Sequence, residues 1–165
     1  MKQFLPTLTT SQGILICGLI SASLYCSALL FQYFGGLNPC SLCLLQRWPH
    51  VIIIFLSALA PLLRAPRFLL TVIAVTALVS VILATFHAGV EWGLWAGPIG
   101  CTANIAAGGD LSSLTDSILA TTVVRCDEVT WSFLGLSMAV WNSLFSLDIC
   151  LVALICLRTK EKGVS

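Results

Sequence analysis

The sequence contains few charged residues. Only 9% of its 165 residues are Asp, Glu, Lys or Arg, whereas 58% are hydrophobic. Water-soluble domains have about 25% charged residues, so this composition excludes an ordinary soluble core. Lys and Arg form no cluster or stripe away from the chain ends, so the basic surface that nucleic-acid binding requires is missing. No internal repeat interrupts the chain. We therefore expect one domain, residues 1–165, that lies in a lipid bilayer and binds no nucleic acid.

Four apolar segments have about the 20-residue length that a helix needs to cross a bilayer. They span residues 13–34, 43–63, 68–86 and 136–157. The first is longer than the apolar part of a signal peptide, and no small-x-small cleavage site follows it, so we interpret it as an uncleaved span. Pro66 can end one helix and open the next, which favours a hairpin connection. The sequence predicts an all-α membrane protein, an antiparallel bundle of four transmembrane helices with a short loop 35–41 and a long loop 88–135.

The positions of Lys and Arg predict how the bundle is oriented. Six of these residues lie near the two chain ends and in the turn at Pro66: Lys2, Arg64, Arg67, Arg158, Lys160 and Lys162. Because cytoplasmic segments carry the excess of Lys and Arg, we expect both termini in the cytoplasm. Arg47 and Arg125 then lie at or beyond the outer face, and the loops 35–41 and 88–135 are both periplasmic.

One stretch of the long loop has helical periodicity. Leu111, Leu114 and Ile118 recur at helical spacing with polar residues between them. Such a stretch lies flat on the outer leaflet or packs on the turns of its own loop, and the sequence leaves both readings open.

The eight cysteines fall into two groups. Four lie within the expected spans, where free cysteine acts as a small apolar side chain: Cys17, Cys26, Cys150 and Cys156. The other four lie at or beyond the outer face, where disulfides persist: Cys40, Cys43, Cys101 and Cys126.

The Cys40-Ser41-Leu42-Cys43 segment is a C-x-x-C motif. This spacing permits a readily exchanged disulfide and lowers the pKa of one thiol. Haem attachment is excluded because Leu44 stands where C-x-x-C-H requires histidine. A structural zinc site is disfavoured because Cys101 and Cys126 are far apart in the sequence and have no histidine near them. We therefore expect a redox pair and no metal.

Arg47 follows Cys43 by one helical turn and so shares its helix face. A cation just inside a span indicates function. Arg47 can stabilise a thiolate on Cys43 and can donate hydrogen bonds to a carbonyl oxygen of a ligand. The alternative is an arginine that extends to the outer headgroups, but the adjacent C-x-x-C favours the functional reading.

Three further polar residues lie in or near the spans. Asp148 stands in the middle of the fourth span, where we expect a protonated carboxyl bonded to a Ser or Thr of a neighbouring helix. His50 has no assigned role, and Pro49 beside it is expected to bend the helix. His87, at the outer end of the third span, is a candidate proton relay or hydrogen-bond donor. An interfacial histidine bonded to the loop is the alternative.

Taken together, these features resemble the DsbB family, the disulfide bond formation protein B group of quinone-dependent thiol oxidases. The resemblance covers nearly the whole chain. It is carried by the four spans and by three motifs: Pro39-Cys40-Ser41-Leu42-Cys43 followed by Arg47, the loop pair Cys101 and Cys126, and the run Trp131-Ser132-Phe133-Leu134-Gly135-Leu136-Ser137-Met138.

The resemblance implies a relay of electrons in a bacterial inner membrane. A periplasmic thioredoxin-like oxidase of the DsbA type attacks the loop disulfide, and the electrons pass to the C-x-x-C pair and then to ubiquinone or menaquinone. Cys101 forms the mixed disulfide with the partner, and Cys126 exchanges with Cys40. Cys43 is the thiolate next to the quinone, which Arg47 holds. A partner as oxidising as about −120 mV requires a still stronger acceptor, which agrees with this direction.

The family often has a polar residue near the quinone at the position of His87. Two departures are visible: Ala139 stands where the family usually has proline, and Tyr25 and Cys26 occupy a stretch where some members carry an acid. Neither touches the four outer cysteines or Arg47.

Three other functions share some of these sequence features. A DsbB-like oxidase serving one dedicated partner has the same sequence features. A non-catalytic scaffold with structural disulfides is disfavoured by the C-x-x-C motif next to an intramembrane arginine. A transporter is expected to show broken helices or paired charges near mid-membrane, for which Asp148 alone is thin support.

Overall fold

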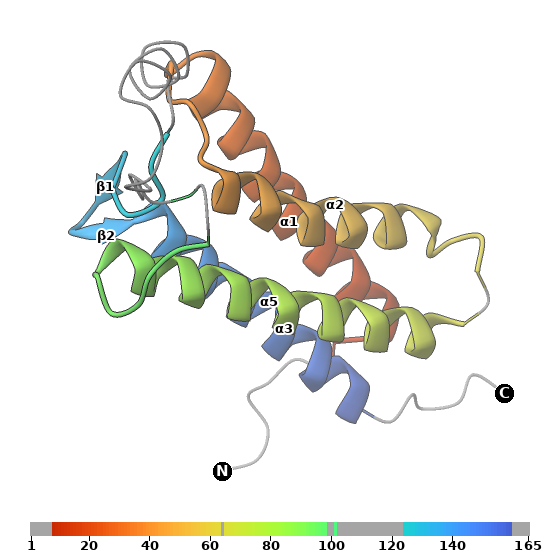
Figure 1. The fold of residues 1–165 in the computed structure, drawn as a ribbon. Coiled ribbons are helices and arrows are strands. Elements are labelled where there is room, and N and C mark those ends of the chain that lie inside the picture. The colour runs from red at the N-terminus through yellow and green to blue at the C-terminus, as the bar shows by residue number, and fades with distance from the viewer. Residues whose placement is uncertain (1–7, 64, 99–100, 102–123, 160–165) are drawn as a thin grey trace, which may run out of the picture.

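The structure is a computed structural model that describes residues 8–63, 65–98, 101 and 124–159. Its elements in chain order are α1 (Thr10–Tyr33), α2 (Ser41–Leu59), α3 (Pro66–Glu91), β1 (Ser132–Phe133), β2 (Leu136–Ser137) and α5 (Met138–Arg158) (Figure 1). All four helices are long and apolar enough to cross a membrane. The predicted fold class, a bundle of four transmembrane helices, is confirmed.

The helix ends differ from the expected spans. Thr9 caps α1, because its hydroxyl accepts from the backbone N–H of Gln12 while the Gln12 side chain accepts from the N–H of Thr9. Pro66 opens α3 as predicted. That helix continues to Glu91, more than a turn beyond the expected end at residue 86, because α-helical backbone bonding persists past the polar His87. Residues 88–91, expected in the long loop, are therefore helical.

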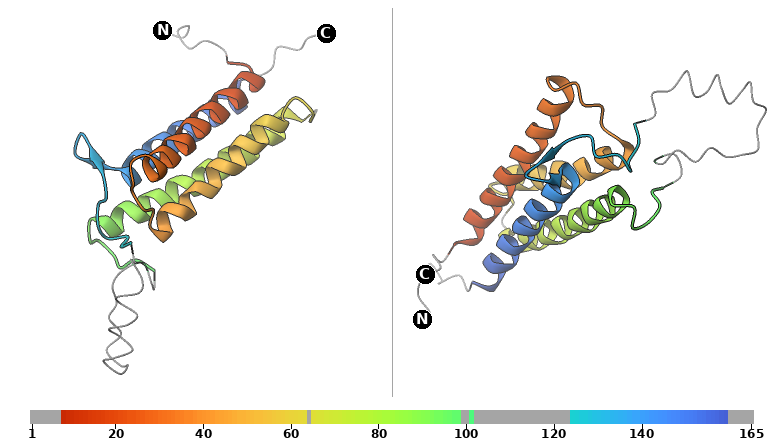
Figure 2. Two further views of the ribbon diagram at one scale, coloured as in Figure 1. Left: turned by 90° about the horizontal axis from the view of Figure 1, so that it is seen from above. Right: turned by 90° about the vertical axis from the view of Figure 1, so that its left-hand side faces the viewer.

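The chain folds up and down, so neighbouring helices run antiparallel. α3 packs most extensively against α5, and α1 against α2. At one end, called here the inner end, the hydroxyl of Thr159 donates to the carbonyl oxygen of Leu8 (3.3 Å), and Arg67 donates to that of Leu157 (2.9 Å). The start of α1, the turn between α2 and α3, and the end of α5 thus share the inner end (Figure 2).

The bundle buries a narrow core and exposes apolar side chains around it. The core includes Ile53, Leu70 and Ile149, each fully buried. Gly18 lets α1 approach α2 closely, because a Cβ at this position would lie 2.6 Å from the Cβ of Ser57. Large apolar side chains such as Phe68 point outward, as expected where the outer solvent is lipid.

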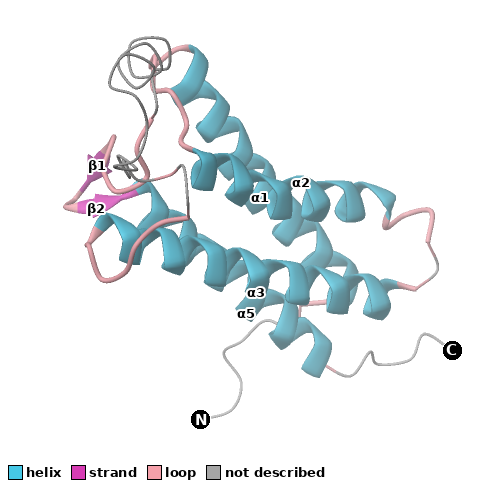
Figure 3. Cartoon of the chain, in the orientation of Figure 1, coloured by secondary structure: helices cyan, strands magenta, loops and turns pink. Residues whose placement is uncertain are grey.

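The other end, called the outer end, carries the β1–β2 hairpin (Figure 3). Leu134 (φ 53°) and Gly135 (φ 78°) form its two-residue turn, in which both residues adopt positive φ. Ser137 then caps α5 by accepting from the N–H of Val140 at 3.3 Å. The Trp131–Met138 run thus sets the start of the last helix. The periodic stretch at Leu111, Leu114 and Ile118 lies outside the described residues.

Candidate thiol redox site

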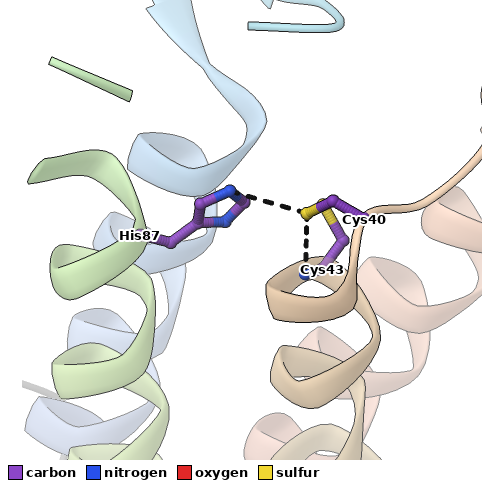
Figure 4. A group of neighbouring side chains, drawn as sticks. All are labelled: Cys40, Cys43 and His87. Carbon is purple, nitrogen blue, oxygen red and sulfur yellow. Dashed lines mark hydrogen bonds between the residues drawn. The ribbon is translucent and has the colours of Figure 1, made fainter. Parts of the chain in front are cut away.

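The C-x-x-C motif stands at the start of α2. Cys40 is the residue that caps this helix, and its Sγ accepts from the backbone N–H of Cys43 at 3.1 Å. The Sγ atoms of the two cysteines are 2.6 Å apart. The helix start thus holds the two sulfurs together, and a helix N-terminus stabilises a thiolate placed there. Figure 4 shows the sulfur of Cys40 facing His87 of α3.

The second cysteine pair forms a disulfide that packs on the first. Cys101 and Cys126 are joined, with Cα atoms 5.2 Å apart, a normal separation for a disulfide. The hydroxyl of Ser41, inside the C-x-x-C motif, lies 2.9 Å from the Sγ of Cys101 and 3.6 Å from that of Cys126. Three of the four cysteines are buried in one cluster, and Cys43 packs against it. Because Cys101 and Cys126 are themselves buried, an attacking thiolate has to displace part of their cover.

His87 of α3 contacts the C-x-x-C pair. Its Nε2 lies 3.7 Å from the Sγ of Cys40, and its side chain is buried (Figure 4). The amide nitrogen of Gln46 is 2.7 Å from Nδ1 of the same ring. Glu91, one turn further along α3, brings a carboxylate oxygen to 3.9 Å from Nε2 and accepts a hydrogen bond from Ser137. Gln46 and Glu91 were not predicted as site residues, although helical spacing places Gln46 on the face of Cys43 and Glu91 on the face of His87.

These neighbours make Cys40 the acidic thiol of the reduced pair. The hydrogen bond from Cys43, opposed by burial and aided by the hydrogen bond from His87, lowers the pKa of Cys40 to about 4. The negative charge of the reduced pair therefore lies on Cys40. The role that the resemblance gives to Cys43, a thiolate next to the quinone, stays a prediction.

Arg47 faces the same cavity as Cys43 but bonds elsewhere. Its Nη1 donates to the side-chain oxygen of Gln32 on α1 at 2.5 Å. Among the described residues, Arg47 makes no hydrogen bond to either sulfur of the C-x-x-C pair. Arg47 thus makes no contact in this structure that supports a Cys43 thiolate. Its side chain lines the cavity, and its contact with a ligand stays a prediction.

A cavity of about 470 Å³ opens beside the cysteine pair. Apolar and aromatic side chains such as Phe31, Trp131 and Phe145 form most of its wall. Polar side chains that reach it come from α1, α2, α3 and α5, and include Gln32, Gln46, Arg47, His50, His87, Glu91 and Asn142. A mostly apolar cavity with a few converging polar groups is typical of a site for a small organic molecule.

The donor atoms of Cys40, Cys43 and His87 lie within 4.8 Å of one another, a grouping that a metal ion can use. In the sequence no histidine stands near the loop cysteines. In the fold, α3 brings His87 next to Cys40 and Cys43. In the described part of the chain this cluster offers three donors, whereas a closed structural zinc site takes four. The 2.6 Å sulfur separation is also shorter than two tetrahedral ligands at about 2.3 Å from one zinc would show. We therefore assign the group to thiol chemistry.

The structure gives the surroundings of two polar residues in the helices, His50 and Asp148. His50, left unassigned, is buried and bonds to Asn142 and Ser21. Asp148 was expected to bond to a Ser or Thr of a neighbouring helix, and this is wrong. The side chain is exposed on α5 and makes no hydrogen bond with a described residue, because its position on the helix turns it away from α1 and α3.

Four apolar helices with two packed cysteine pairs at one end, beside an apolar cavity, define a membrane protein that exchanges disulfides. The chain matches the description "Disulfide bond formation protein DsbB" over residues 10–156 and belongs to that family, as the resemblance predicted.

Individual relatives support the same family. The chain is 29% identical over 164 residues to the Disulfide bond formation protein B of Verminephrobacter eiseniae, covering 94% of this chain and 89% of the relative. It is 31% identical over 164 residues to that of Pasteurella multocida, covering 94% and 90%. An uncharacterized protein of Rickettsia prowazekii is 30% identical over 129 residues, covering 76% and 74%. The protein is therefore a multi-pass membrane protein of disulfide formation.

Proposed function

We propose that this protein is a thiol:quinone oxidoreductase that re-oxidises a periplasmic thioredoxin-like oxidase of the DsbA type. Electrons pass through Cys101 and Cys126, then through Cys40 and Cys43, to ubiquinone or menaquinone. One observation carries the proposal: the loop disulfide packs on the C-x-x-C pair through Ser41, and that pair in turn lines an apolar cavity. A structural disulfide would need neither neighbour.

The electron path is a series of thiol–disulfide exchanges. A partner thiolate attacks Cys101 and releases Cys126. The partner's second thiolate then attacks the partner sulfur of this mixed disulfide, which forms the partner's disulfide and releases Cys101 as a free thiol. Cys126 attacks Cys40 of the Cys40–Cys43 disulfide and releases Cys43. Attack by Cys101 on Cys126 restores the loop disulfide and leaves the C-x-x-C pair reduced. Two electrons and two protons have then moved from the partner to Cys40 and Cys43.

Cys40 and Cys43 carry the charge at different stages. While Cys40 is bonded to Cys126, Cys43 is the free sulfur, and it lines the cavity. Once both are thiols, the hydrogen bond from Cys43 and the neighbouring His87 favour the thiolate on Cys40. The role that the family resemblance gives to Cys43 therefore belongs to the first stage.

The cavity suits a quinone as the electron acceptor. Its aromatic wall matches a flat apolar ring, and Arg47 presents planar N–H donors suited to a carbonyl oxygen. His87 lies at the same wall, within reach of Cys40. A bound quinone supplies an acceptor for two electrons and two protons, so the net reaction converts a partner dithiol and quinone into a partner disulfide and hydroquinone.

We place the protein in the bacterial inner membrane with both termini in the cytoplasm. The shared inner end of α1 and α5, and the Lys and Arg excess near the chain ends, support this orientation. A reporter fused after Lys162 should register as cytoplasmic and one inserted near Gly108 as periplasmic. The reverse result would place the cysteines in a reducing compartment and contradict the proposal.

A trapping experiment tests the proposed function. With Cys126→Ser, Cys101 is a free thiol that attacks the disulfide of an oxidised DsbA-type oxidase, and no thiol at position 126 remains to resolve the product, so a disulfide-linked complex between Cys101 and the oxidase should accumulate. The matched control is Cys26→Ser, which removes an exposed cysteine within α1 and should trap nothing. No complex, or a complex that survives removal of Cys101, would contradict the relay.

A further inference from the structure

We infer that Gln46 and Asn142 are positioning residues that fix the tautomer of His87, so that the ring presents its Nε2–H to Cys40. The inference deepens the proposed function and rests on it, since it assumes that Cys40 works as a thiolate. It concerns a chain of side-chain hydrogen bonds that crosses the bundle from α5 through α2 to α3.

The direction of this chain follows from the chemistry of the amide groups. The Nδ2 group of Asn142 donates to Oε1 of Gln46 at 2.7 Å. An amide nitrogen only donates and an amide oxygen only accepts, so the oxygen of Gln46 is committed to Asn142. Its nitrogen then faces Nδ1 of His87 at 2.7 Å and donates to it. Nδ1 is therefore an acceptor and carries no proton.

A neutral imidazole whose Nδ1 accepts must carry its proton on Nε2. That nitrogen lies 3.7 Å from the Sγ of Cys40. The proton consequently points at the sulfur and stabilises its negative charge. The opposite tautomer would turn a lone pair toward the thiolate and remove this stabilisation.

The far end of the chain prevents either amide from turning over alone. Oδ1 of Asn142 is 2.8 Å from Nε2 of His50 and accepts from the hydroxyl of Ser146 at 3.4 Å. If Asn142 exchanged its oxygen and nitrogen, His50 would have to take its other tautomer and the Ser146 hydroxyl would have to stop donating, so the groups of this chain can reverse only together. His50 in turn has the hydroxyl of Ser21 on α1 at 3.5 Å from its Nδ1. His50, which the sequence left unassigned, thus anchors the chain.

Because the chain is buried, reversing a single hydrogen bond in it costs free energy. Gln46, His50 and His87 are 6%, 3% and 4% exposed, and among the described residues no buried side-chain N or O atom lacks a partner. Reversing one amide would place two donors or two acceptors face to face away from water. Because a side-chain amide is a poor carrier of protons, the chain serves orientation, and proton transfer stays between Cys40, His87 and the acceptor.

The titratable and charged groups around Cys40 come from several elements. Cys43 lies on α2 itself, and His87 and Glu91 face Cys40 from α3. Further groups on the shared cavity wall are Tyr25 on α1, Arg47 on α2, and Arg125 and Glu128 before β1. The part of α5 at this wall contributes Asn142, which does not titrate. Gln46 and Asn142 carry no charge, so their hydrogen bonds act on Cys40 through His87.

The test compares two substitutions of Gln46 that have opposite hydrogen-bonding properties. The measurement is the pH midpoint of Cys40 alkylation in reduced, detergent-purified protein without quinone or partner, followed by mass spectrometry of the Cys40 peptide. A Cys43→Ser background leaves one reactive sulfur in the motif and keeps an O–H donor to it. Since neither quinone nor partner takes part, failure of this inference is distinguishable from failure of the proposed relay.

Gln46→Leu removes the donor to Nδ1, frees both tautomers, and should raise the midpoint by about one pH unit. Gln46→Glu supplies an acceptor, so Nδ1 takes up a proton and both ring nitrogens donate; the midpoint should fall. A carboxylate that acted only as a nearby negative charge would raise the midpoint. Shifts in the same direction, or no shift in either variant, would overturn the inference.

Asn142→Leu supplies an independent arm that does not alter any group touching His87. It frees the amide of Gln46 to turn over, so the midpoint should rise, by less than in Gln46→Leu. The matched control is Ser143→Ala, which removes the neighbouring hydrogen bond between α5 and Thr85 of α3 (2.9 Å) and should leave the midpoint unchanged. If Asn142→Leu and Ser143→Ala shifted the midpoint equally, the cause would be a general loosening of the packing of α3 against α5. That result would overturn the positioning role of Asn142.

Discussion

The inner and outer ends of the bundle use cysteine for different purposes. Toward the inner end, Cys17 and Cys150 are buried among apolar side chains. Within the described part of the chain, their sulfurs bond to backbone carbonyl oxygens, those of Ile149 and Ala74, at 3.7 Å. At the outer end, each cysteine has a second cysteine beside it, and Cys40 also has a helix N-terminus and a histidine.

This difference shows that the surroundings of a thiol decide its chemistry. A thiol among apolar groups stays protonated and acts as packing, whereas donors aimed at the sulfur stabilise the thiolate that attacks disulfides. The predictions below change one end at a time and are ordered by the size of the expected effect.

The largest effect is expected from removing a sulfur at the outer end. Cys40→Ser or Cys43→Ser should abolish quinone reduction, because serine cannot form the disulfide through which the electrons pass. The protein should still accumulate in the membrane, since the core lies elsewhere. The measurement is quinol formation by purified protein supplied with a reduced partner. Turnover close to wild type in either variant would contradict the relay.

A smaller effect is expected at Arg47. Arg47→Ala should weaken the apparent affinity for quinone by roughly ten- to a hundredfold, the usual range for a charged hydrogen bond. Arg47→Lys keeps the charge but loses the planar donors, so its affinity should fall between that of Ala and that of wild type. The dependence of rate on quinone concentration measures both. Arg67→Ala, at the inner end, is the control and should leave the quinone dependence unchanged. If Arg47→Ala had the same quinone dependence as wild type, Arg47 would only anchor α2.

The pH dependence of Cys40 separates the two ends without any change of sequence. Its pKa is lowered to about 4, so the thiolate should persist as the pH falls from 8 toward 5 and be lost as the pH passes through about 4. Alkylation of the reduced protein, resolved peptide by peptide, should therefore stay fast for Cys40 across that range. A midpoint near the ordinary thiol value of about 8.5 would remove the distinction between the two ends.

The smallest effect is expected at the inner cysteines. Cys17→Ala, Cys150→Ala and Cys156→Ala should leave turnover within about twofold and reduce the free energy of unfolding by roughly 1 kcal/mol each. A Cβ on Gly13 would lie 2.6 Å from the Sγ of Cys156. Gly13→Ala should therefore be much less destabilising in Cys156→Ala than alone, a coupling that a double-mutant cycle measures. A large loss of activity in any of these three cysteine variants would mean that the inner cysteines also take part in the reaction.

The sequence predicted the features that local pattern determines. Apolar runs gave the four helices, and spacing singled out the C-x-x-C pair and placed Arg47 beside it at the same cavity. The end of α3 was predicted too early because His87 looks like a boundary in a hydropathy scan, while the backbone continues its hydrogen bonding to Glu91.

The long-range contacts were not predictable from one sequence. The hydrogen bond between Gln46 and His87 joins positions 41 residues apart, and that between Asn142 and Gln46 joins positions 96 apart. No local period encodes such pairs, since they depend on how the helices pack. The hydrogen bond predicted for Asp148 was wrong for the same reason. The sequence places this residue in the middle of a span, but the packing of α5 decides which way its side chain points.

The most direct test of the central claim is the stoichiometry of electron transfer. Purified protein, with quinone added, is mixed with a reduced DsbA-type oxidase, and thiol loss and quinol formation are followed in the same sample. The relay predicts one quinol for every two thiols consumed, with both signals abolished in Cys40→Ser and unchanged in Cys150→Ala. Thiol consumption without quinol, or quinol formation that survives loss of Cys40, would contradict it.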